Sequence, residues 1–160
     1  MDSASDAATL RAHVSAQAHT TFCEPAGELI FPYICPGGFY RQLWDWDAVF
    51  AGIGSLPFGS APYLCGSMMN FLHKTDLATG RVPGCLTPIG PSQTLAHAKP
   101  VLIWGAYLGA RATGDYAQFR AFAPAMEALL AFWQRERHDA ATGLFVWYDQ
   151  MESGADDLPL

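Results

Sequence analysis

The fold of this chain is decided by one stretch, Val101-Leu102-Ile103-Trp104-Gly105-Ala106-Tyr107-Leu108. Pro100 stands directly before it, where the first turn of a helix tolerates a residue without an N–H. These residues predict a helix from about 100 to 112. Because the stretch is apolar on nearly every side, we expect that helix to be buried on every side.

The segment that follows, residues 115–136, has the pattern of an outer, amphipathic helix. Its large apolar side chains fall on one stripe, and its charged side chains lie elsewhere. The stripe consists of Phe119, Phe122, Met126, Leu129, Leu130 and Trp133. The short turn Ala112-Thr113-Gly114 joins the two segments, so together they predict an αα-hairpin with an inner and an outer helix.

Three more helices are predicted upstream of this hairpin, at about 6–20, 46–54 and 62–73. Ser5 or Asp6 is expected near the N-cap of the first. Residues 48–73 carry no charged side chain, but six glycines and prolines interrupt them. We therefore expect two buried helices there and not a membrane span.

Two long connections separate these helices. Residues 25–43 and 76–98 are rich in proline and glycine. For 25–43 this composition predicts irregular or short extended structure, and for 76–98 it predicts a long connector of a kind that is often functional. The motif Asp76-Leu77-Ala78-Thr79-Gly80 recurs as Asp139-Ala140-Ala141-Thr142-Gly143, 63 residues later. This spacing fits one helix pair with its loops and favours an array of such pairs. The alternative is that the motif is good turn chemistry that occurs twice.

The composition restricts the class of partner. The chain has 160 residues, of which 51% are hydrophobic and only 15% are charged, and its net charge is −6. Its nine basic residues are scattered, which argues against nucleic acid and anionic membranes as partners. The acidic N-terminus lacks the apolar segment of a secretory signal, so we expect a cytoplasmic location.

The cysteines and histidines give no metal-site pattern. Cys23, Cys35, Cys65 and Cys85 fit no zinc-site spacing, and the five histidines are dispersed. We therefore expect no transition metal and no cofactor. Buried free thiols are the favoured interpretation of the cysteines, and a disulfide between loops remains open.

Acid–base chemistry is suggested by the last ten residues, 151–160. Glu152, Asp156 and Asp157 crowd around a Ser-Gly turn, and clustered carboxylates are typical of hydrolytic sites. Glu152 and Asp156 lie on one loop, so we expect them to act on one side of a substrate and not as a complete acid–base pair. The alternative is a solvated acidic turn that caps the next helix.

Aromatic residues beside carboxylates point to sugar binding. In Trp44-Asp45-Trp46-Asp47, indole rings can stack on a pyranose and a carboxylate can accept from hydroxyl groups. The alternative is an N-cap with core tryptophans. Trp147 and Tyr148 are candidate walls of a subsite or packing residues. Lys99 can pair with an acidic substrate group, pair with a nearby carboxylate, or lie on the surface.

Three segments in this order resemble one enzyme family. They are Phe39–Phe50, then Lys99–Tyr107 with Thr113-Gly114-Asp115, then Gly143–Tyr148 leading into Glu152–Pro159. Together they resemble the six-hairpin (α/α)-toroid glycoside hydrolases of families 63 and 37, which include mannosyl-oligosaccharide glucosidases, mannosylglycerate hydrolase-like enzymes and trehalases. The resemblance covers about residues 30–160.

For the fold, the resemblance implies an all-α, incomplete (α/α) six-hairpin toroid with long Pro/Gly-rich loops. About five or six of roughly twelve helices would be present. Residues 1–160 would be the N-terminal part of a single catalytic domain, with 1–24 as a helical lead-in. The remainder of the toroid would then be needed for folding, and we expect this chain alone to be inactive and to self-associate.

For the function, the resemblance implies an inverting, exo-acting hydrolase of an α-glucosidic or α-mannosidic bond, with a small saccharide as its partner. The general acid falls on Asp156, and the general base lies on a segment absent from this sequence. Substrate-binding roles fall on Tyr40, Gln42, Trp46, Asp47, Lys99, Trp147 and Glu152. Lys99-Pro100 departs from the family's frequent Gln-Pro, and Ala155 replaces a residue that is often bulky.

Two functions of other classes stay open. One is a non-catalytic sugar-binding module built on the same toroid. The other is a toroid-type sugar epimerase, whose acid and base are histidines. The dispersed histidines give the epimerase little support.

Overall fold

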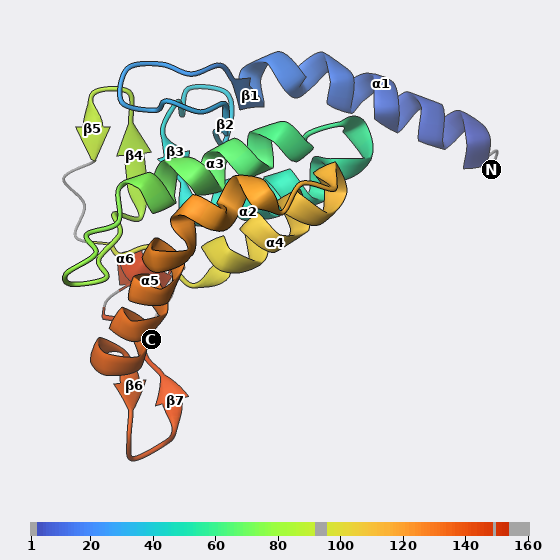
Figure 1. Cartoon of the computed structure of the whole chain (residues 1–160). Coiled ribbons are helices and arrows are strands. Elements are labelled where there is room, and N and C mark those ends of the chain that lie inside the picture. Colours follow the sequence, from blue (N-terminus) through green and yellow to red (C-terminus); the bar gives the residue numbers. More distant parts are fainter. Residues whose placement is uncertain (1–2, 92–95, 149, 154–160) are drawn as a thin grey trace.

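The computed structural model describes residues 3–91, 96–148 and 150–153. Most of these residues are helical, which confirms the all-α class and an incomplete helical fold. The α-helices of the described residues are α1 (Ser3–Thr21), α2 (Asp45–Ser55), α3 (Ala61–His73), α4 (Val101–Thr113), α5 (Ala123–Glu136) and α6 (Gln150–Ser153). Figure 1 shows their arrangement.

Short antiparallel sheets form within the connections. The strands are β1 (Phe22–Cys23) with β2 (Tyr33–Ile34), β3 (Leu43–Trp44) with β4 (Cys85–Thr87) and β5 (Gly90–Pro91), and β6 (His138–Asp139) with β7 (Leu144–Phe145). In the middle sheet, Leu43 pairs with Leu86 and Trp44 with Cys85. This pairing ties the residues just before α2 to the connection that leads to α4.

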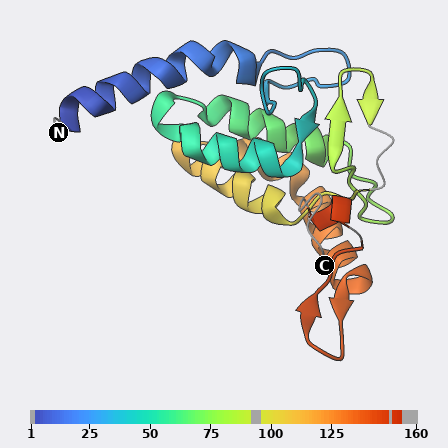
Figure 2. The same cartoon turned by 180° about the vertical axis from the view of Figure 1, so that it is seen from behind.

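The core lies between α2, α3 and α4, which pack against one another (Figures 1 and 2). Glycines on α4 permit this close approach. A Cβ at Gly109 would lie 2.7 Å from the sulfur of Cys65, and one at Gly105 would lie 2.8 Å from the sulfur of Met68. The residues 48–73 therefore form two helices joined by a turn, as expected. No helix in the described parts of the chain is long and apolar enough to cross a membrane.

The inner helix α4 is buried on one side only. Leu102 and Ala106 are in the core, whereas Trp104 is 47% exposed and Tyr107 is 51% exposed. The expectation of burial on every side is therefore wrong for the described chain. Helices α2 and α3 and the segment Ala117–Phe122 cover only part of a helix that is apolar all round.

The segment 115–136 is not one continuous helix. A 3₁₀ segment, η2 (Ala117–Phe122), precedes α5, and Pro124 lies in the first turn of α5. Because proline lacks an N–H, it fits this turn but not a helix interior, so a new helix begins here. The predicted stripe is also too wide: Leu129 and Trp133 are buried, whereas Leu130 is 46% exposed.

The N-terminal helix α1 extends away from the helical body (Figures 1 and 2). It begins at Ser3, earlier than the N-cap expected at Ser5 or Asp6. Most of its side chains are exposed. The guanidinium of Arg11 lies 5.8 Å from the ring centroid of Phe58, and β1 joins the helix to the body.

The two copies of the repeated motif, residues 76–80 and 139–143, form the same turn. In each, the aspartate side chain accepts from the N–H two positions on and from the threonine hydroxyl three positions on, at 2.6–3.0 Å. These hydrogen bonds lower the pKa of Asp76 and of Asp139. The first turn follows α3 and the second follows α5, so the same turn chemistry recurs after two different helices.

Candidate active site

Three of the predicted site residues lie at one end of the helical body: Trp46 in the first turn of α2, Lys99 just before α4, and Glu152 in α6. Asp45, which is not among the predicted site residues, is the first residue of α2. In both views α6 lies near the starts of α2 and α4 (Figures 1 and 2). The three connections that enter these helices therefore form one end of the helical body.

A buried ion pair joins the starts of α2 and α4. The Asp45 carboxylate accepts from the backbone N–H of Lys99 at 3.0 Å, from Lys99 Nζ at 3.1 Å and from the Trp46 N–H at 2.8 Å. Both side chains are almost fully buried. Burial raises the pKa of Asp45, and Lys99 opposes that rise. Of the three interpretations of Lys99, pairing with a nearby carboxylate is the one observed, and its contact with substrate stays a prediction.

A second buried carboxylate anchors α6. Glu152 is 1% exposed, and it accepts from Arg137 Nε at 2.9 Å and from Arg137 Nη2 at 3.1 Å. The Tyr148 N–H also donates to it. Because two nitrogens of Arg137 bind the two carboxylate oxygens of Glu152, the pair fixes the end of α5 to α6. Sequence reasoning missed Arg137, because a basic residue at the end of a helix is common and gives no further signal.

An aromatic row runs along this end of the molecule, consisting of Trp104, Phe50, Trp46, Trp147 and Trp133. Phe50 stacks on Trp46 with a centroid separation of 5.1 Å and meets Trp104 edge-on at 6.3 Å. Trp147 meets Trp46 at 6.4 Å and Trp133 at 5.6 Å. Only Trp133 is fully buried, so the other rings offer apolar surface that a sugar face can cover.

Two predicted site residues carry buried polar atoms with open hydrogen-bonding capacity. Within the described residues, neither Trp46 Nε1 nor Gln42 Oε1 has a hydrogen-bond partner. Buried polar atoms are nearly always paired, so these two atoms are suited to meet a ligand or water. Asp47 and Tyr40 are exposed. The sequence pattern favoured Asp47, but Asp45 is the carboxylate that connects the two helices.

The predicted general acid, Asp156, lies outside the described residues, and so does Asp157. Their roles stay predictions. The last described residue before them, Ser153, closes α6, directly after the anchored Glu152.

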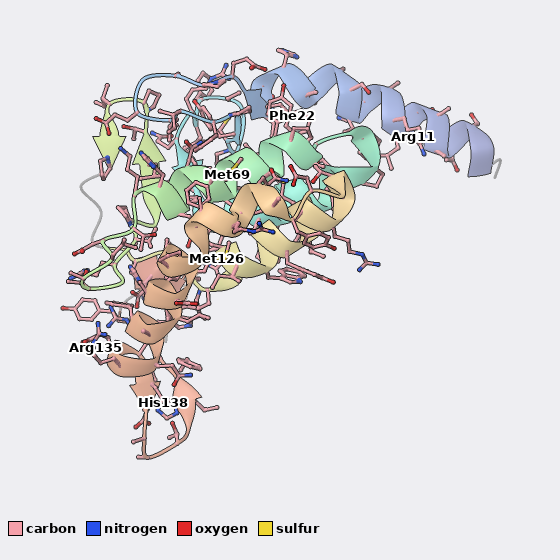
Figure 3. The ribbon with its side chains drawn as sticks, viewed as in Figure 1. Arg11, Phe22, Met69, Met126, Arg135 and His138 are labelled. Atoms are coloured by element: carbon pink, nitrogen blue, oxygen red, sulfur yellow. The ribbon has the colours of Figure 1, made fainter. Side chains whose placement is uncertain are left out.

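A cavity of about 490 Å³ lies beside the Glu152–Arg137 pair. Its walls are Thr79, Arg81, Phe132, Arg135, Glu136, Arg137 and Tyr148. Arg137 is paired with Glu152 and Arg135 with Glu136, so among the described residues Arg81 gives the cavity its excess positive charge. Arg135, which donates to the Thr79 carbonyl at 2.8 Å, is labelled on the C-terminal half of α5 in Figure 3.

His97 lies behind the aromatic row, almost fully buried. Its Nδ1 accepts from the Val82 N–H at 3.0 Å, and its ring centroid lies 3.9 Å from that of Phe132. Burial lowers the pKa of His97 to about 3. The imidazole is therefore neutral at physiological pH and packed in the core.

Comparison with known proteins places these residues within one family. The family model of the mannosylglycerate hydrolase MGH1-like glycoside hydrolase domain matches residues 40–159. The periplasmic trehalase of Pseudomonas aeruginosa is 30% identical over 105 residues, which are 64% of this chain and 18% of that protein. The periplasmic trehalase of Escherichia coli O139:H28 is 28% identical over 103 residues, which are 64% of this chain and 17% of that protein.

The chain thus spans less than a fifth of the length of these curated relatives. No solved structure matches it significantly. The family match includes every predicted site residue from Tyr40 to Asp156, and it confirms the resemblance inferred from the three sequence segments. The chain therefore belongs to the family of the mannosylglycerate hydrolase MGH1-like glycoside hydrolase domain.

Proposed function

We propose that this chain is part of an inverting, exo-acting glycoside hydrolase that cleaves an α-glucosidic or α-mannosidic bond. The observation that carries the proposal is the meeting of an exposed aromatic row with anchored carboxylates where α2, α4 and α6 begin. Aromatic faces bind the C–H face of a pyranose, and the partly exposed rings of this row are available for that contact.

Asp156 is the proposed general acid, four positions after Glu152. The Glu152–Arg137 pair anchors α6, the last described element before Asp156 in the sequence, and Glu152 is proposed to line the sugar site. Inverting hydrolysis needs a second carboxylate at roughly 6.5–9.5 Å, with a water molecule between the two. We place that general base on another hairpin of a six-hairpin toroid, to which residues 1–160 contribute one part.

The cationic cavity favours a substrate with an anionic group over a neutral disaccharide. Arg81 has no hydrogen-bond partner for its guanidinium among the described residues, and the group lies 6.0 Å from the Phe132 ring centroid. A planar guanidinium held over a ring is well suited to bind a carboxylate or phosphate. Tyr148 lines the same cavity and stands four positions before Glu152, which connects the cavity to the proposed site.

The test is turnover by a protein that contains this chain together with the remaining hairpins. It should be screened against a neutral α-glucoside, trehalose and mannosylglycerate. Asp156→Asn should abolish turnover and retain sugar binding, whereas the matched control Asp157→Asn should retain turnover. Full activity of Asp156→Asn would remove the residue from its proposed role. An Arg81→Met variant that lowers affinity for neutral and anionic substrates equally would contradict the anion preference.

The other two functions make different predictions. A sugar-binding module would bind the ligand with no turnover in any variant. An epimerase needs a histidine that exchanges protons with substrate. His97, the most buried of the described histidines, is packed behind the aromatic row with its Nδ1 engaged, so the structure gives the epimerase no added support.

A further inference from the structure

The sulfur atoms of Cys23 and Cys35 lie 3.5 Å apart. A disulfide has an S–S distance of about 2.04 Å, so the two atoms need to approach by only about 1.5 Å. We propose that Cys23 and Cys35 are a redox modification site, at which a small-molecule disulfide such as oxidised glutathione converts the two thiols into a disulfide.

The backbone holds both thiols in this position. Cys23 ends β1 and pairs with Tyr33 of the antiparallel β2, and the Cys35 N–H donates to the Thr21 carbonyl at 2.9 Å. On the side of the body, Phe22 stacks on Tyr63 of α3 with centroids 5.0 Å apart, and Figure 3 shows Phe22 where α1 meets α3. These contacts hold the two segments in register and keep the two sulfur atoms next to each other.

The exposures of the two sulfurs set the order of the reaction. Cys23 is partly exposed, whereas Cys35 is fully buried. The Cys23 thiolate attacks one sulfur of the small disulfide and releases one small thiol. Cys35 then attacks the Cys23 sulfur of this mixed disulfide and releases the second small thiol. The protein loses two protons and two electrons, and the small disulfide gains them.

The disulfide would fasten α1 to the helical body. It closes the loop of residues 23–35, which includes the core residue Leu29. This loop begins in β1, the strand that directly follows α1. A cross-link of this kind restricts the unfolded chain, so the oxidised protein should unfold at a higher urea concentration. This inference does not depend on the proposed enzymatic function, because neither cysteine belongs to the candidate site.

The test is a count of this chain's thiols in a folded protein that contains the chain. After treatment with oxidised glutathione, the protein is denatured, alkylated and mapped by mass spectrometry. We expect two of the four cysteines to escape alkylation, and a cross-linked peptide that joins Cys23 to Cys35. The same treatment in guanidinium chloride should give mixed pairings, because only the fold selects this pair.

Two single variants separate the steps. Cys35→Ser should stop at a stable glutathione adduct on Cys23, and Cys23→Ser should stay unmodified because Cys35 is buried. If native wild-type protein keeps four alkylatable thiols, or links either cysteine to Cys65 or Cys85, the proposal is wrong. The wild-type peptide map decides the matter even if a variant fails to fold.

Discussion

His97 should make this protein sensitive to mild acid. The pKa of a free histidine is 6.5, whereas burial, followed by the positive charges of Arg137, Arg81 and Lys99, lowers the pKa of His97 to about 3. The hydrogen bond from the Val82 N–H also requires an unprotonated Nδ1. Between these two pKa values the unfolded chain binds a proton that the folded chain does not. Stability therefore falls as the pH falls below 6.5.

The size of the effect follows from the two pKa values. Each pH unit within this window is worth about 1.36 kcal/mol, so His97 by itself should lower the free energy of unfolding by about 2.7 kcal/mol on acidification to about pH 4.5. That is a large part of the ~5–15 kcal/mol by which domains are usually stable. The low pKa values of Asp76 and Asp139 act below this window, because acids with lowered pKa values lose their contribution only near and below their ordinary pKa of 3.8.

The variant that isolates this effect is His97→Asn. An asparagine Oδ1 can accept from the Val82 N–H but does not titrate. Loss of the ring packed on Phe132 should cost roughly 2–3 kcal/mol at neutral pH. Between about pH 6.5 and 4.5, however, the variant should lose about 2.7 kcal/mol less than wild type.

The assay is urea unfolding, followed by tryptophan fluorescence at several pH values, at dilutions where the midpoint no longer depends on protein concentration. The exposed His138→Asn is the matched control and should keep the wild-type pH dependence. Equal losses of stability on acidification in wild type and His97→Asn would refute the reasoning.

Four further substitutions test the packing and the exposed surface. Gly80→Ala and Gly143→Ala alter the same turn at φ +78° and +72°, but only at Gly80 would a Cβ meet a backbone carbonyl, at 2.0 Å. Gly143→Ala should cost about 1 kcal/mol and Gly80→Ala at least about twice that, and equal urea midpoints would contradict the clash. Glu152→Gln leaves Arg137 without its charge partner and should cost about 3 kcal/mol at neutral pH, measured in the same assay. Tyr107→Ser removes a half-exposed ring from α4 and should weaken self-association in sedimentation experiments, whereas an unchanged association constant would place the contact elsewhere.

The helices were largely predictable from the sequence because their signals are local. The predicted segments 46–54 and 62–73 correspond to α2 (Asp45–Ser55) and α3 (Ala61–His73), where apolar residues recur between prolines and glycines. The break before α5 was missed, although Pro124 marks it, because the apolar stripe continues across the break.

The ion pairs of the candidate site could not be predicted in the same way. Asp45 and Lys99 are 54 positions apart, and whether they meet depends on how α2 and α4 pack. Two aspartates with similar neighbours, Asp45 and Asp47, face opposite environments because the first turn of α2 directs one into the core and the other into solvent. Periodicity tells which residues share a helix face, but it does not tell which helix start lies beside another.

The half-exposed α4 and the candidate site have one common explanation. The rings of Trp104 and Phe50 are half exposed and belong to the same aromatic row as Trp46 and Trp147. In an ordinary single-layer helical domain such a row would promote aggregation, because exposed aromatic rings associate with those of other molecules. In the proposed toroid, the inner helices α2 and α4 line a central cavity. The side that faces this cavity would be apolar where the helices pack against one another and aromatic at the helix starts, where sugar binds. In that proposed arrangement the high hydrophobic content of the chain would serve a second surface besides the core, and both sides of α4 would be used.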